Sequence, residues 1–244
     1  MNVAIVLLAL FGSAWLLAVI EAWTTTGRLR LTAPLLSGLA HLGRESIVPR
    51  TPDRVFFEAA PILLLVVAVL GAAVLPLAPA LVIADLATGA LFINAALAYV
   101  LVALIMAGWG PNGAYAMIGG WRFLGQLIAY AMLIVMPITA VAMRAESLVS
   151  TVIVGSQEGL WNIVYQPLGF VLFFIAAMAL AFRAPFDLPT AEGELGGGVD
   201  AEYTGVRLAV LRLARLTLVV TLASATSVFY LGGWHGPLLP PWAW

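Results

Sequence analysis

The sequence predicts an all-α fold: a polytopic transmembrane helical bundle of about six spans, forming a single membrane domain over residues 1–244. Two observations predict this class. The 244 residues are 63% hydrophobic and 9% charged, with a mean hydropathy of +1.07, whereas a soluble domain is about 25% charged. Six separate stretches have the roughly 20 apolar residues that a helix needs to cross a bilayer. There is no cysteine and no internal repeat.

Taken in order, the apolar stretches define the expected spans. The first stretch lacks a basic leading segment and is as long as a full span, so we interpret it as a retained helix rather than a signal peptide. Pro76, Pro137 and Pro167 lie within or at the ends of later stretches, where neighbouring helices or water can satisfy the freed carbonyls. The expected spans are residues 3–23, 57–77, 86–107, 123–143, 163–182 and 206–231.

The arginines are distributed unevenly over the connecting segments. The expected loops 24–56, 108–122 and 183–205 share one side of the bundle, and arginines lie in or beside each of them, whereas the opposite side has only Arg144. By the positive-inside rule, these three loops are expected to face the cytoplasm and both termini to lie outside.

A short helix is expected between the first two spans. Leucines recur there at helical spacing while polar residues occupy the other side, which is typical of an amphipathic helix lying flat on the membrane. An ordinary polar loop is the alternative. The leucines are Leu35, Leu39 and Leu42, and the polar residues are His41, Arg44 and Glu45.

The last expected loop, residues 183–205, carries five of the twelve acidic residues of the chain. These acids either form a proton-exchanging cluster whose pKa values mutual repulsion raises, or dock a basic face of a soluble partner, or are simply solvated. The ordered sequence from Arg183 to Pro189 indicates a rigid turn and so argues against the third interpretation. The acids are Asp187, Glu192, Glu194, Asp200 and Glu202.

Charged residues also lie inside the expected spans, where their burial is costly. Glu58, about one turn into the second span, either relays a proton or is a first-turn carboxylate favoured by the helix dipole. Arg207, Arg212 and Arg215 form a basic face on the first turns of the last span. We expect Arg212 and Arg215 to pair with the acidic loop, and an anionic lipid headgroup is the alternative partner.

The absence of cysteine excludes disulfides, thiolate iron–sulfur ligation and Cys-based zinc sites. Only His41 and His235 remain as imidazoles, too few and too far apart in the sequence to suggest a metal or haem pair. We expect no catalytic residue, no metal and no cofactor bound within this chain, and no nucleic-acid partner.

The acidic loop resembles a known family signature. The segments Arg183-Ala-Pro-Phe-Asp-Leu-Pro-Thr-Ala-Glu-Gly-Glu-Leu195 and Glu202-Tyr-Thr-Gly205 are similar to the quinone-chamber membrane subunit of respiratory complex I, known as its H subunit or subunit 1. The resembled family includes the counterparts of this subunit in energy-converting membrane-bound nickel–iron hydrogenases. Further similar segments are residues 85–92, residues 107–119 with Arg122, Gln126 and Tyr130, residues 157–167, Arg44-Glu45 with Pro49, and Leu231-Gly-Gly-Trp234.

The resemblance implies a membrane-anchoring and coupling subunit of a redox-driven ion-translocating assembly in a bacterial or archaeal inner membrane. Its expected partners are a hydrogenase-like large subunit and an iron–sulfur small subunit on the cytoplasmic face, antiporter-like membrane subunits, and the lipid bilayer. The iron–sulfur clusters belong to the partners, and quinone is the ligand of a chamber that this chain helps to form. The alternative is the equivalent subunit of a hydrogenase-, formate- or ferredoxin-linked complex that uses no quinone.

Residue roles follow from the same resemblance and, for Glu58, Arg212 and Arg215, from the charges found inside the expected spans. The candidates for a proton path or coupling are Asp187, Glu192, Glu194, Glu202 and Glu58. The candidates for docking or for the quinone chamber are Arg183, Arg122, Gln126, Tyr130, Arg44, Glu45, Arg212 and Arg215.

The chain also departs from the family pattern. Ala131, Leu180 and Arg215 stand where the family has glutamates, and the family's Gln-x-Arg-x-Gly-Pro after the first span is not recognisable. The sequence ends after the sixth expected span, so the resemblance is to a shortened member with a thinned intramembrane proton relay. The sequence does not identify the electron donor, the acceptor or the transported ion.

A transporter acting alone is the interpretation from another class of protein. Transport requires polar residues that converge near the middle of the membrane. The central parts of the expected spans offer little beyond Asn94, Thr139 and Thr221, so the sequence argues against this function.

Overall fold

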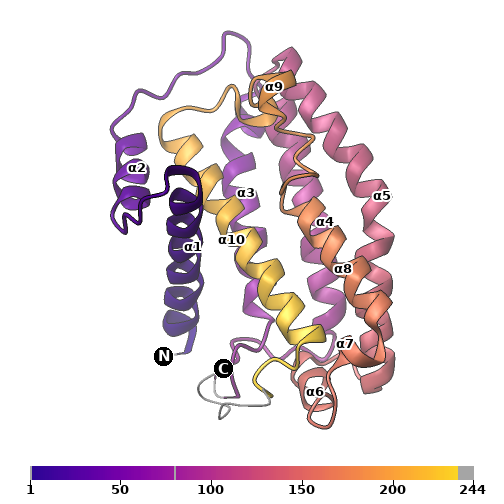
Figure 1. The fold of residues 1–244 in the computed structure, drawn as a ribbon. Helices are drawn as coiled ribbons and strands as arrows, with labels where there is room; N and C mark the ends of the chain where they lie inside the picture. The colour runs from indigo at the N-terminus through magenta and orange to yellow at the C-terminus, as the bar shows by residue number, and fades with distance from the viewer. Residues whose placement is uncertain (1, 80, 236–244) are drawn as a thin grey trace.

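Long helices that run up and down one bundle dominate the computed structural model, which describes residues 2–79 and 81–235 (Figure 1). Within these residues five helices are long and apolar enough to cross a membrane. All elements assigned there are helical, so the expected all-α fold is confirmed. The five helices are α1 (Asn2–Thr26), α3 (Arg54–Ala73), α4 (Gly89–Trp109), α5 (Ala114–Ala145) and α10 (Gly205–Tyr230).

The fifth expected span differs from a simple helix. Its region contains α6 (Ser150–Gly155), α7 (Asn162–Tyr165) and α8 (Pro167–Leu180). The 14 residues of α8 extend about 21 Å at a rise of about 1.5 Å per residue, which is less than the roughly 30 Å of a hydrocarbon core. Figure 1 shows α8 ending partway along the bundle, so irregular backbone completes the crossing.

The other boundaries differ from those expected by a few residues, for local reasons. Asp53 caps α3, because its Oδ1 accepts hydrogen bonds from the amides of Val55 (3.1 Å) and Phe56 (3.4 Å), and so the helix begins before residue 57. Helix α5 begins at Ala114 rather than near residue 123. Arg122 therefore lies within this helix and not at the border of a loop.

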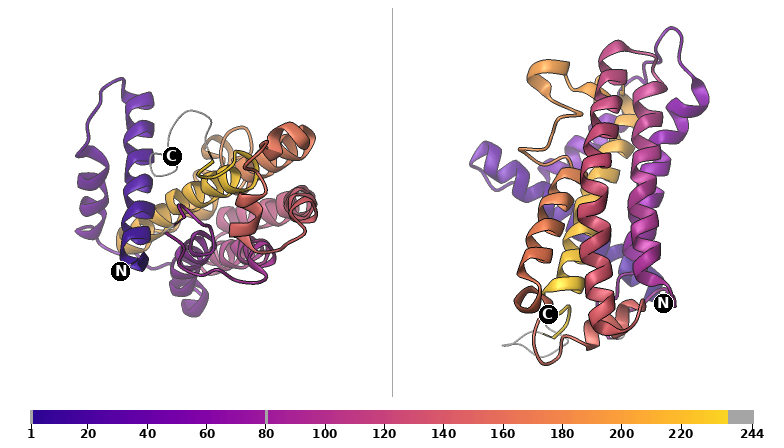
Figure 2. Two further views of the ribbon diagram at one scale, coloured as in Figure 1. Left: turned by 90° about the horizontal axis from the view of Figure 1, so that it is seen from below. Right: turned by 90° about the vertical axis from the view of Figure 1, so that its right-hand side faces the viewer.

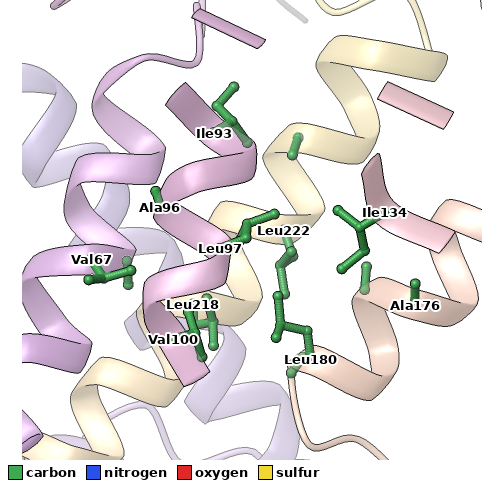
Figure 3. Close-up of a cluster of buried hydrophobic side chains, with 14 of the residues drawn as sticks. Val67, Ile93, Ala96, Leu97, Val100, Ile134, Ala176, Leu180, Leu218 and Leu222 are labelled. Carbon is green, nitrogen blue, oxygen red and sulfur yellow. The ribbon is translucent and has the colours of Figure 1, made fainter. Parts of the chain in front are cut away.

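The core lies where α3, α4, α5, α8 and α10 meet, and Figure 3 shows part of it, including Val100, Ile134 and Leu218. Apolar side chains alone do not drive association in lipid, so close packing supplies the attraction. At Gly108 an added Cβ would lie 2.8 Å from the carbonyl oxygen of Ala116 and 3.1 Å from Cα of Gly120. Glycine at residue 108 therefore permits the close approach of α4 and α5.

Helices α1 and α2 (Ala33–Leu42) form one edge of the bundle beside α10 (Figure 2). The helix expected between the first two spans is thus present. Its leucines Leu35, Leu39 and Leu42 are exposed, whereas His41 is buried. The polar face of α2 therefore turns partly toward the protein.

The three expected loops on one side meet at one end of the bundle. The amide of Ile47 donates to Oγ1 of Thr204 (2.8 Å), and the amide of Asp53 donates to the carbonyl of Gly110 (2.9 Å). The first residues of α1 and the last residues of α10 lie at the opposite end (Figure 1). The connecting segments expected on one side therefore pack against one another.

Candidate functional site

The end of α8 and the irregular segment after it are held by two side chains of α5 that the sequence singled out, Gln126 and Tyr130. Gln126 is buried, and its Nε2 donates to the carbonyls of Ala179 (3.1 Å) and Phe186 (2.9 Å). The ring of Tyr130 meets the ring of Phe186 edge-on at 5.5 Å between centroids. Irregular backbone at membrane depth is tolerated only where protein satisfies its polar groups, and Gln126 does so here.

Arginines from other elements neutralise part of the acidic loop. Nη1 of Arg122 lies 2.6 Å from Oε2 of Glu194, in the short helix α9 (Glu192–Leu195). Nη1 of Arg215 lies 2.5 Å from Oδ2 of Asp200, at the end of the 3-10 helix η1 (Gly198–Asp200). The expected pairing of Arg215 with the acidic loop is thereby confirmed.

The remaining loop acids do not join these pairs. Asp187 and Glu202 are exposed, and the side chain of Glu192 lies outside the described part of the structure. Asp187 contributes to the turn through its backbone, because its carbonyl accepts from the amides of Thr190 (3.1 Å) and Ala191 (3.0 Å). The described acids are thus spread along the loop with separate surroundings.

Arg183, the first residue of the loop motif, forms an ion pair with Glu21 of α1. Glu21 lies near the end of the first expected span, residues 3–23. In the structure it links the first helix to the segment after α8. The only sequence signal that Glu21 could have an arginine partner was the excess of arginines on that side of the bundle.

Glu58 faces the first turn of α10. Nε of Arg207 donates to Oε2 of Glu58 (2.9 Å), Nη2 of Arg207 also contacts Oε1, and the guanidinium lies 5.1 Å from the centroid of the Phe57 ring. The side chain of Glu58 is 55% exposed. This carboxylate therefore has a fixed cationic partner and partial contact with solvent.

The prediction that Arg212 pairs with the acidic loop is wrong. Its Nη1 lies 2.9 Å from Nε2 of His41, on α2. The reason is geometric: residue 212 lies about 140° around the helix from Arg207, and α2 covers that side of α10, whereas the acidic loop lies over another.

Burial lowers the pKa of His41, and the nearby charges of Arg212 and Arg44 lower it further. Because a guanidinium can only donate, Nε2 of neutral His41 accepts from Arg212 and the ring proton resides on Nδ1. This nitrogen is buried and has no hydrogen-bond partner within the described residues. His41 therefore leaves the charge of Arg212 uncompensated.

A groove lies between α1, α2 and α10, and we call it the α1–α2–α10 groove. Its volume is about 540 Å³, and its walls are mostly apolar. His41 and Arg212 are the ionisable residues at its lining. Other lining residues include Phe11, Ala14 and Trp15 on α1, Leu35 and Leu39 on α2, and Leu213 on α10.

Two departures from the family pattern meet at a second, much smaller cavity. Ala131 and Leu180 line it together with Gln126 and Tyr130, and its volume is about 10 Å³. A single water requires roughly 10–15 Å³ of such space. The positions where the resemblance implies glutamates are therefore neighbours across α5 and α8, in surroundings with little room for water.

Tyr203 anchors the end of the acidic loop. Its ring stacks on Phe57 at 4.7 Å between centroids, and its hydroxyl donates to the carbonyl of Ala107 (3.3 Å). Burial is the main reason that its pKa is raised well above the ordinary value, and the charge of Asp200 adds to the effect. The phenol therefore stays protonated and acts as a structural group.

Among residues 2–79 and 81–235, no three His, Asp or Glu side chains gather in a way that could hold a metal ion. Arg44 and Glu45, which the sequence proposed for docking, are exposed beyond the end of α2. Their backbone carbonyls lie close to Gly205 at the start of α10. The segment that follows α2 thus packs against the end of the acidic loop.

The bundle, the irregular fifth crossing and the apolar groove together define a class: a multi-pass helical membrane protein with an interfacial helix beside an apolar cavity. A family model described as NADH dehydrogenase matches residues 22–244. The chain belongs to this family, which is that of the H subunit (subunit 1) of complex I, as the loop motif indicated.

Curated relatives agree with this assignment. The chain is 37% identical over 227 residues to the NADH-quinone oxidoreductase H subunit 1 of Geobacter metallireducens, a match that covers 89% of this chain and 69% of the relative. Two proteins of Geobacter sulfurreducens, the NADH-quinone oxidoreductase H subunits 1 and 2, are also 37% identical, over 241 and 227 residues. These matches cover 90% and 89% of this chain and 69% of each relative.

Proposed function

We propose that this chain is the membrane subunit through which quinone in the bilayer reaches a complex I-like oxidoreductase. The observation that carries the proposal is the α1–α2–α10 groove, an apolar cavity of about 540 Å³ beside the interfacial helix. Quinones are apolar molecules dissolved in the membrane, so a path to a redox centre requires an opening toward lipid. The names of the relatives, which include quinone, support this substrate class.

The end of the bundle where the three loops meet is the docking surface in this proposal. It presents exposed charges of both signs, which suits a soluble partner of mixed charge, and it is expected to face the cytoplasm. The partners proposed for it are the hydrogenase-like large subunit and the iron–sulfur small subunit. The exposed residues that we assign to docking are Arg44, Glu45, Asp187 and Glu202.

The intramembrane proton relay is interrupted in this proposal. The loop acids Glu194 and Asp200 are paired with arginines, and the next positions along the implied path, Ala131 and Leu180, line a cavity of about 10 Å³. Transfer of protons through that region would require a carboxylate or a chain of waters. We therefore assign coupling to the antiporter-like subunits and to movements of the loop.

The transporter interpretation gains no support from the polar residues of the spans. Oγ1 of Thr221 donates to the carbonyls of Ala68 and Thr217, at 2.9 Å each. Oγ1 of Thr139 donates to the carbonyl of Val135, one turn earlier in its own helix (2.8 Å). Both hydroxyls are therefore satisfied by backbone carbonyls, and only that of Thr221 reaches a neighbouring helix.

Two leucines of α2 provide a direct test of quinone access. Leu39 lines the groove, and its neighbour Leu36 is equally exposed, at 62% against 61% for Leu39, but is not part of the lining. We expect Leu39→Trp to fill the groove and lower NADH–quinone turnover several-fold, and Leu36→Trp to leave it unchanged. The measurement is turnover of the purified complex with a long-chain quinone.

Electron transfer to a water-soluble acceptor serves as the control for assembly and should be the same in both variants. Equal quinone turnover in the Leu39→Trp complex and the native complex would exclude this route. Turnover with no quinone present would favour the hydrogenase-, formate- or ferredoxin-linked alternative instead.

A further inference from the structure

The arginines of α10 differ in what neutralises them. In the described part of the chain Arg207 pairs with Glu58 and Arg215 pairs with Asp200. Arg212 is in none of the ion pairs formed there, and its contact is the neutral imidazole of His41. Its side chain is exposed at the edge of the α1–α2–α10 groove. A cation without a carboxylate partner therefore borders a mostly apolar cavity.

The surroundings of this cation attract further negative charge. Five arginines lie on the segment that includes α2 and its flanks, at residues 28, 30, 44, 50 and 54, against only two acids, Glu45 and Asp53. Asp53 is used as the cap of α3. Clusters of arginine at a membrane surface favour anionic over neutral lipids, and a phosphate is a suitable acceptor for a guanidinium.

We propose that Arg212 binds the phosphate of an anionic phospholipid from the bilayer, whose acyl chains occupy the α1–α2–α10 groove. A molecule with this form matches both parts of the site. The headgroup supplies the negative charge that Arg212 lacks, and the chains cover Trp15, Leu35, Leu39 and Leu213, which line the groove. Lipid and quinone then exclude each other, so the lipid sets how often the groove is free.

Trp15 is a built-in reporter for this site, because it lines the groove and its Nε1 donates to the carbonyl of Leu31 (3.2 Å). The full chain is reconstituted in phosphatidylcholine vesicles that contain phosphatidylglycerol with brominated acyl chains, which quench tryptophan fluorescence at short range. The signal of Trp15 is the difference between the native chain and the Trp15→Phe chain. Brominated phosphatidylcholine at the same mole fraction gives the reference quenching.

We expect brominated phosphatidylglycerol to quench Trp15 more strongly than brominated phosphatidylcholine. Arg212→Gln should reduce this preference about fivefold, as loss of one lipid-facing cation implies, and Arg212→Lys should retain most of it. The matched control is Arg28→Gln, which removes an exposed arginine of the same segment outside the groove. Absence of a preference in the native chain, or the same preference in Arg212→Gln, would overturn the proposal.

A titration with decylubiquinone, itself a quencher, separates this inference from the proposed function. Quenching of Trp15 by the quinone with no preference for the anionic lipid would overturn the lipid site and leave quinone access standing. A strong lipid preference with no quenching by the quinone would support the lipid site and count against quinone access through this groove.

Discussion

At the scale of single residues, the polar side chains of this protein are divided between holding backbone and compensating charge. Gln126 donates one hydrogen bond to Ala179 in the last turn of α8 and one to Phe186 beyond it, where backbone amides of a continuing helix would otherwise donate. Tyr203 stacks and donates one hydrogen bond while its hydroxyl stays protonated. Protonation of His41 is unfavourable in the folded protein, because its imidazole is buried and lies near the cations Arg212 and Arg44.

The pKa of His41 should lie below 6.5, the ordinary value for the imidazole. The imidazole of His41 takes up a proton at a higher pH when α2 is unfolded or detached than when α2 is packed. The packing of α2 on α10 is therefore fully stable above pH ~6.5 and weakens as the pH falls below that value. Nitrogen NMR of the labelled imidazole in nanodiscs measures the pKa and the tautomer directly.

Variants of the two neighbouring arginines provide the control. Arg212→Gln should raise the pKa of His41 more than Arg44→Gln does, and neither should restore the ordinary value, because burial is the largest cause of the shift. An imidazole that titrates at or above 6.5 in the native protein would contradict the buried, neutral state.

At the scale of elements, the fifth crossing departs most from the regular pattern. Helix α8 ends at Leu180. The residues that follow it are held by the ion pair of Arg183 with Glu21 and by the contacts of Gln126 and Tyr130 with Phe186. Hydropathy could indicate a crossing there, because residues 163–182 are apolar. It could not indicate where the helix stops, because that depends on partners contributed by α1 and α5.

The contact of α4 with α5 should be sensitive to added volume. Gly108→Ala places a methyl group 2.8 Å from a backbone oxygen of the neighbouring helix, and overpacking of this kind costs about 1–3 kcal/mol. We expect a lower apparent Tm for the purified protein in mild detergent. Gly125→Ala on α5 is the control, because nothing lies within 4 Å of its added methyl group, and it should leave the Tm unchanged or higher.

At the scale of the whole molecule, charge and apolar surface are separated in space. The expected cytoplasmic loops gather at one end, while the α1–α2–α10 groove opens at the edge formed by the first helices (Figures 1 and 2). In our proposal the end of the bundle where the loops gather binds the soluble arm. The edge with the α1–α2–α10 groove admits quinone or lipid. Binding of soluble partners at that end would, in this proposal, leave the groove accessible.

Docking can be tested by reversing one charge at each end of the bundle. Glu202→Arg changes an exposed residue of the acidic loop, and we expect it to lower retention of the soluble arm about twofold to fivefold, as loss of one exposed charge pair implies. Glu158→Arg is the control, since this exposed residue lies between α6 and α7 at the other end. Equal retention of the soluble arm in the two purified variants would exclude Glu202 from the docking surface.

The sequence by itself determined the class of protein, most of the spans, the interfacial helix and the family. It could do so because hydropathy and a long motif depend only on residues near one another in the chain. Only the tertiary structure decided that α8 stops short, that Arg212 faces His41, that Glu21 meets Arg183, and that a groove separates α1, α2 and α10. Each of these depends on which helices lie side by side, and helix packing in lipid follows from the close fit of side chains that no local pattern encodes.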